Sequence, residues 1–179
     1  VGEPNAGKST FLATVTAAQP KVADYPFTTL SPNLGVVQLS GFRSFVIADI
    51  PGIIEGAHEG KGLGHQFLRH IERTRILLLM IPVDSVDPQA ELDRLRSELE
   101  AYSVDLASTP YLVALTKVDV LAEDAELPQI ETGNAMGIAS VSSVTRTHLE
   151  SLLERLWSES QRVVEEERGS GKEDQWWAP

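Results

Sequence analysis

The first ten residues, VGEPNAGKST, combine residue types that bind phosphate groups. Gly2 to Ser9 fit the spacing G-x4-G-K-[ST] at every position. The glycines allow a tight turn that points several backbone N–H groups at a di- or triphosphate. Lys8 brings a positive charge to the β- and γ-phosphates, and the Ser9 hydroxyl is a suitable Mg²⁺ ligand. The stretch therefore predicts a nucleotide phosphate loop.

The residues after Lys8, KSTFLATV, predict a helix that starts at this loop. The partial positive charge of a helix N-terminus adds to phosphate binding. We therefore expect the nucleotide to contact the loop and the first helical turn, through Asn5, Ala6, Gly7, Lys8, Ser9 and Thr10.

Two further segments carry groups for the γ-phosphate and the metal. Asp49 directly follows the apolar run SFVIA, where it can hold Mg²⁺ through water, and Gly52 offers a backbone N–H to the γ-phosphate. The segment YPFTTLSPN (25–33) includes Phe27 as a nucleotide contact and a threonine that can close over the γ-phosphate. Thr28 and Thr29 are both candidates for the metal ligand and the sequence does not choose between them; Thr29 is the working assignment, beside Ser9 and Asp49.

A fourth segment, Thr116-Lys117-Val118-Asp119, predicts base recognition after the run YLVAL. The Asp119 carboxylate can accept hydrogen bonds from N1–H and the exocyclic amine of guanine, and adenine presents a different edge. The Lys117 stem can lie along the base plane. Ser142 and Ser143, further along, are candidates to donate a backbone N–H to guanine O6.

Short apolar runs and helical patterns alternate along the chain and would position these groups. Runs at 36–39 and 44–49, joined by a turn at 40–43, and runs at 76–83, 111–116 and 137–142 predict strands. Leucines at three- and four-residue spacing predict helices around 92–102 and 149–156. This order indicates a three-layer α/β domain with a mostly parallel sheet, which binds ligands at the carboxyl ends of its strands.

Composition narrows the class of protein. The 179 residues carry a net charge of −11, so we expect no broad basic surface and no direct DNA binding. They include no cysteine, which excludes disulfides and favours a reducing compartment such as the cytoplasm. No apolar run approaches the ~18 residues of a membrane-spanning helix, and no signal peptide is visible.

On these motifs the chain resembles the G domain of the Obg family of P-loop GTPases. The most specific stretch is DIPGIIEGAHEGKGLGHQFLRHIERT (49–74), and ADYPFTTLSPNLGVV (23–37) matches the first switch. The resemblance runs from Val1 to about Trp157. It implies binding of GTP and GDP with Mg²⁺, slow GTP hydrolysis, and association with the large ribosomal subunit during assembly.

The resemblance also implies a division of the chain. Residues 1–160 are expected to form an Obg-type G domain whose first strand is largely missing, and 161–179 a helix end with a charged C-terminal tail. The closing WWAP could dock on the domain or on a partner.

Three positions depart from the pattern of the family. Thr116 stands where asparagine is usual, so it keeps a hydroxyl but loses the amide that contacts the base and braces the phosphate loop. Glu3 stands where an aromatic or apolar residue is common, and we expect it to face solvent because a carboxylate repels phosphate. Ser143 and Arg146 replace alanine and glycine and should not abolish binding.

The catalytic assignment follows from the same comparison. Ile53 occupies the place of the water-orienting glutamine of Ras-like enzymes, which predicts slow intrinsic hydrolysis. Potassium-stimulated relatives use an asparagine at position 5 to hold K⁺, so the catalytic set is Asn5, Lys8, Thr29 and Gly52. The histidines at 58, 65 and 70 are interpreted as packing or partner contacts. The alternative function is a non-catalytic sensor of GTP, GDP or ppGpp; Asp119 argues against an ATPase.

Overall fold

The structure is a computed structural model that describes residues 1–16, 21–22, 33–49, 74–122 and 124–169. Several predictions fall outside these ranges. They concern the tail after 169, the residues of the two switch stretches between 23 and 32 and between 50 and 73, and with them Phe27, Thr28, Thr29, Gly52, Ile53, His58, His65 and His70.

A parallel sheet forms the centre of the described chain. It contains β4 (Leu77–Pro82), β5 (Tyr111–Thr116) and β6 (Ile138–Ser140), with β5 in the middle. β4 and β5 are buried over nearly their whole length, because both faces of this sheet are covered. The three strands predicted from apolar runs are thereby confirmed, and the α/β fold class with them.

A second, antiparallel sheet contains β1 (Lys21–Val22), β2 (Asn33–Leu39) and β3 (Arg43–Asp49). In the ladder of β2 and β3, Asn33 is paired with Asp49 and Leu39 with Arg43. The turn between them uses positive φ angles at Gly41 (71°) and Phe42 (59°). The predicted pair of strands is confirmed.

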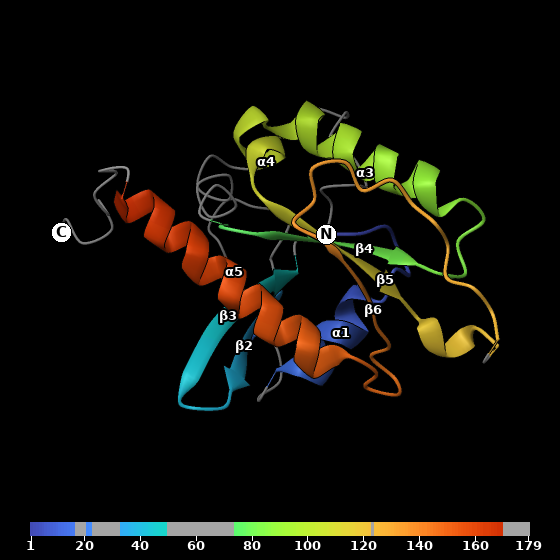
Figure 1. The fold of residues 1–179 in the computed structure, drawn as a ribbon, viewed down its shortest axis with the longest axis horizontal. Helices are drawn as coiled ribbons and strands as arrows, with labels where there is room; N and C mark the ends of the chain where they lie inside the picture. The colour runs from blue at the N-terminus through green and yellow to red at the C-terminus, as the bar shows by residue number, and fades with distance from the viewer. Residues whose placement is uncertain (17–20, 23–32, 50–73, 123, 170–179) are drawn as a thin grey trace.

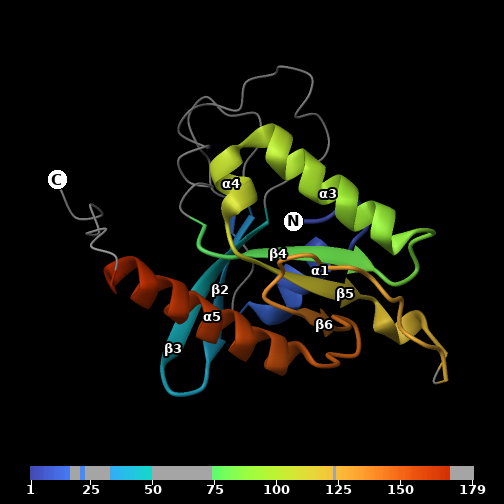
Figure 2. The ribbon, with the colours of Figure 1, turned by 45° about the horizontal axis from the view of Figure 1, so that its top comes forward.

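Helices cover both faces of the parallel sheet (Figures 1 and 2). On one face lie α3 (Pro88–Tyr102) and the short α4 (Val104–Ser108); on the other lie α1 (Lys8–Val15) and α5 (Leu149–Gly169). The start of α3 is fixed by Pro88 in its first turn and by the Asp87 carboxylate, which accepts from the Ala90 N–H at 2.9 Å. This arrangement is the three-layer domain that the sequence predicts.

The alternation of side chains along the strands divides the core in two. Leu79 and Ile81 of β4 point to the α3 side, where they join Leu92 and Leu95 in one buried cluster. Met80 and its β5 neighbours point to the opposite side and pack with Phe11 and the buried leucines of α5. The core therefore fixes α1 and α3 on opposite sides of β4. The loop before α1 then lies at the edge formed by the carboxyl ends of the strands.

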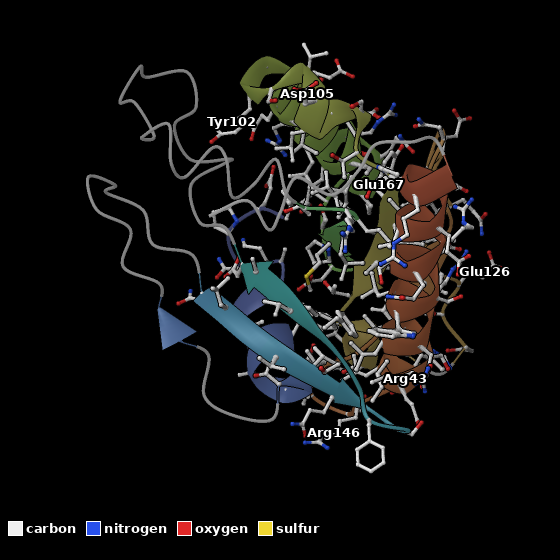
Figure 3. All side chains as sticks on the ribbon, turned by 90° about the vertical axis from the view of Figure 1, so that its left-hand side faces the viewer. Arg43, Tyr102, Asp105, Glu126, Arg146 and Glu167 are labelled. Carbon is white, nitrogen blue, oxygen red and sulfur yellow. The ribbon has the colours of Figure 1, made fainter. Side chains whose placement is uncertain are left out.

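α5 also secures the antiparallel hairpin. Arg43 donates two hydrogen bonds of 2.7 Å to the Glu154 carboxylate, and Figure 3 shows Arg43 beside α5. The Phe45 and Trp157 rings lie 6.2 Å apart between their centres. α5 runs through position 160 without interruption and ends at Gly169. Among the described helices, none has the length and apolar character needed to cross a membrane.

Candidate nucleotide-binding site

The phosphate loop is a compact turn that leads directly into α1 and lies against β4 in space. The Ala6 N–H donates to the Glu3 carbonyl at 3.1 Å, and Asn5 and Gly7 have positive φ angles of 67° and 90°. A side chain at position 2 would place its Cβ 2.8 Å from the Met80 carbonyl oxygen, so glycine is required for the loop to lie against β4. The loop thus has the conformation that the glycine spacing predicts.

The side chain of Lys8 is held over the loop by two backbone carbonyls of the loop itself. Its ammonium donates to the Gly2 carbonyl at 2.6 Å and to the Glu3 carbonyl at 2.9 Å. A lysine ammonium has three N–H donors. Two are used here, which leaves the third for a phosphate oxygen above the loop.

Thr116 braces the loop from β5. Its side chain is 3% exposed, and its hydroxyl donates to the Ala6 carbonyl at 2.9 Å. The amide is lost at this position, as the sequence shows, but the contact with the phosphate loop is made by the hydroxyl. Any loss of nucleotide affinity caused by Thr116 should therefore come only from the missing contact between an amide and the base.

Replacing Thr116 by valine tests this brace. The change keeps the shape of the side chain but leaves the buried Ala6 carbonyl without its partner, a loss of about 1–3 kcal/mol. We expect nucleotide affinity to fall about tenfold and the urea midpoint to decrease. Nucleotide titration and urea unfolding measure the two effects. Thr116→Ser keeps the hydroxyl and is the control; equal affinity in the valine and serine variants would contradict the role of the brace.

The predicted base-recognition residues follow β5 at the same edge of the sheet. Asp119 is exposed in the short 3-10 helix η2 (Val118–Val120). Lys117 has a φ of 60°, and its ammonium lies 3.1 Å from each carboxylate oxygen of Asp84, which follows β4. That ion pair was not predicted, although the rule that polar groups gather at strand ends points to Asp84. The contact of Lys117 with a base remains a prediction.

The segment after β6 distinguishes between the two candidate serines. The Ser142 side chain is fully buried, and its hydroxyl accepts from the N–H groups of Val144 and Thr145 at 3.2 and 3.1 Å. The Ser142 N–H already donates to the Thr147 carbonyl at 3.2 Å. Ser142 therefore shapes the loop, and Ser143 is the better candidate to offer its N–H to a base.

Asp49 and Ser9 provide a donor set that suits Mg²⁺. Asp49 is 9% exposed, and its Oδ1 atom has no hydrogen-bond partner among the described residues. A buried carboxylate oxygen with a free lone pair, and a hydroxyl at the start of α1, fit a hard cation.

The described residues contain no group of three or more His, Cys, Asp or Glu side chains that could hold a metal by themselves. A cluster of this kind is not required for Mg²⁺, which usually takes one or two protein ligands together with phosphate oxygens. The third predicted ligand, Thr29, lies outside the described residues.

Glu3 differs from its prediction. Its carboxylate does not extend into solvent but lies 2.6 Å from the guanidinium of Arg94 on α3, with 24% of the side chain exposed. Nothing in the local sequence signals this pair, because the two residues are brought together by the packing of α3 on β4. The charge of Glu3 is therefore partnered, on the side of the loop that faces α3.

These features define a P-loop nucleotide-binding domain. They are the conformation of the loop, the lysine held over its carbonyls, and the polar groups at the ends of three successive strands. Solved structures share the fold: the G domain of the T. maritima FeoB iron transporter covers 89% of this chain and 95% of its own, with a TM-score of 0.61 and 23% identity. The cytosolic domain of the same transporter in a GDP form gives a TM-score of 0.62 over 90% of this chain and 61% of its own.

Sequence comparison gives the family. The family described as "50S ribosome-binding GTPase" matches residues 1–117. GTPase Obg of Pelodictyon phaeoclathratiforme is 55% identical over 89% of this chain and 47% of its own length, and GTPase Obg of Chlorobaculum parvum is 50% identical over 95% and 51%. The chain belongs to the Obg family of P-loop GTPases. It spans about half the length of these curated relatives.

Proposed function

We propose that this chain is the guanine-nucleotide switch of an Obg-type protein, which binds GTP and GDP with Mg²⁺ and hydrolyses GTP slowly. The observation that carries the proposal is the assembled phosphate loop: Lys8 is held over it by two carbonyls and Thr116 braces it from β5. Asp119 lies after the same strand, and this supports guanine as the base.

The chain's own groups account for binding and for part of the catalysis. The N–H groups of the loop and of the first turn of α1 stabilise negative charge on the phosphates, and Lys8 adds a full charge. Mg²⁺, when bound, neutralises charge on the β- and γ-phosphates, and Ser9, Asp49 and Thr29 would hold it. The Gly52 N–H would contact the γ-phosphate. Ile53 cannot orient water, which is the reason to expect slow turnover.

Calorimetry with GDP, GTP and ATP in the presence of Mg²⁺ tests the proposal. We expect binding of both guanine nucleotides and at least about a hundredfold weaker binding of ATP, because adenine has no N–H at the N1 and C2 positions where guanine donates to Asp119. Absence of binding by both guanine nucleotides would sink the proposal. Single-turnover hydrolysis then separates a slow GTPase from a sensor of GTP, GDP or ppGpp, since the sensor binds GTP without cleaving it.

The proposal also covers the domain organisation, the location and the partner of this protein. Residues 1–160 would form the G domain and 161–179 a helix end and charged tail, within a longer cytoplasmic protein that associates with the large ribosomal subunit. The matching family is one of 50S ribosome-binding GTPases, and this supports the large subunit as the partner. Cosedimentation of the GTP-bound protein with purified large subunits is the test, and a GDP-bound sample is its control.

Asn5 is proposed to hold K⁺ beside the β- and γ-phosphates. Its exposed position and left-handed backbone in the loop support this, because the residue stands clear of the packed side of the turn. We expect GTP turnover to be about tenfold faster in KCl than in NaCl, equivalent to about 1.4 kcal/mol of barrier. Asn5→Ala should remove the difference. Equal rates in the two salts for the unchanged chain would remove the idea.

A further inference from the structure

Glu3 and Ala6 are the two ends of the phosphate-loop turn, and each is tied to a different part of the fold. The two residues are joined by the hydrogen bond from the Ala6 N–H to the Glu3 carbonyl. Thr116 of β5 holds the Ala6 end. Arg94 of α3 holds the Glu3 end through a 2.6 Å ion pair. The same Glu3 carbonyl also accepts from Lys8 at 2.9 Å, so the backbone of residue 3 is linked directly to the phosphate-binding lysine.

Arg94 also faces other negative charge. Glu91, one turn earlier on α3, is 4% exposed, and its Oε1 atom has no hydrogen-bond partner among the described residues. Burial raises the pKa of Glu91, a hydrogen bond with Ser85 opposes this, Glu3 raises it further and Arg94 lowers it. Asp84 raises it as well, but its nearest cation is Lys117. Arg94 thus pairs directly with Glu3, and its charge also favours the ionised form of Glu91.

We propose that Arg94 is a positioning residue of the nucleotide site: it holds the Glu3 carboxylate on α3, away from the phosphates, so that nucleotide affinity depends on it. This rests on the proposed function, since it assigns a residue to that same site. This role requires no contact between Arg94 and the nucleotide or the metal. Arg94 acts by fixing the outer end of the loop and by compensating a carboxylate that would otherwise repel the ligand.

A positioning role for Arg94 differs from a merely stabilising ion pair in its expected effect on nucleotide affinity. Arg94 is 56% exposed, and an exposed pair contributes little to folding. Nucleotide binding is more sensitive, because a freed carboxylate acts on several phosphate charges at once. The loss should therefore grow from GDP to GTP and shrink as salt screens the repulsion.

The test compares GDP and GTP affinities of the full chain and of Arg94→Met, Glu3→Gln and the double variant, at low and high NaCl. We expect Arg94→Met to weaken GTP binding by about tenfold and GDP binding by less, with the difference reduced at high salt. Glu3→Gln should restore most of the affinity in the Arg94→Met background. Arg94→Lys should retain it.

Arg162→Met is the matched control. It removes the same charge from α5, where Arg162 pairs with Glu159 and Glu166 of its own helix. Equal affinities in Arg94→Met and Arg162→Met, an equal loss for GDP and GTP, or no rescue by Glu3→Gln would each overturn the inference. If the unchanged chain binds neither nucleotide, both the proposed function and the inference about Arg94 fail. If the unchanged chain binds both nucleotides and Arg94→Met binds them equally well, only the inference fails.

Discussion

Lys8→Met is expected to lower the affinity for GTP by at least about a hundredfold. A hydrogen bond to a charged group contributes about 1.5–3 kcal/mol, and here the full charge at the phosphates is lost with it. The methionine also leaves the Gly2 and Glu3 carbonyls without the donor that both share in the structure. Fluorescence titration with a labelled GTP analogue measures the change, and GDP should lose less than GTP.

The control for Lys8→Met is unfolding in urea. The two carbonyls lie at a partly buried loop that water can reach, so we expect only a small shift of the unfolding midpoint. A variant that unfolds at much lower urea would mean that Lys8 supports the fold rather than the ligand. A folded variant that binds GTP as well as the unchanged chain would contradict its place in the site.

Asp119→Asn is expected to exchange the preferred base. The carboxylate accepts from two guanine N–H groups, whereas the amide presents one donor and one acceptor. Xanthine carries a carbonyl where guanine carries its amine, so it suits the amide. We expect GTP affinity to fall by about a hundredfold or more and XTP to become the better ligand. Competition between GTP and XTP for a labelled nucleotide measures the exchange.

Asp119 is exposed, so its replacement should leave the fold intact. Asp124→Asn, at another exposed position after β5, removes the same charge and should change neither affinity. If Asp119→Asn weakened GTP without improving XTP, the base would be recognised by other groups. If neither ligand were affected, the base would not lie at the end of β5 at all.

The sequence predicts most of this fold because the signals are local. The apolar run 111–116 coincides with β5, and leucines at helical spacing mark α3 and α5. The phosphate loop is equally local, since its glycine spacing determines its conformation. α4 and β1 are too short to show a period, and no pattern announces them.

The contacts that complete the site depend on tertiary packing. Thr116 braces Ala6 across 110 positions of sequence, and Glu3 finds Arg94 only because α3 packs beside the loop. The sequence indicated that the amide at 116 was lost; it could not indicate that the hydroxyl would reach the same loop. The sequence predicted that Glu3 faces solvent, because a carboxylate near the phosphates would repel them. Pairing with a cation on a neighbouring helix also keeps this carboxylate away from the phosphates.

The pairing of Asn33 with Asp49 has a mechanical consequence. The two stretches expected to sense the γ-phosphate, before Asn33 and after Asp49, attach to the same rung of one ladder. The opposite end of that ladder is pinned to α5 by Arg43 and Glu154. Displacement of either stretch would therefore act at the same end of the hairpin, while the Arg43–Glu154 pair holds the other end against α5.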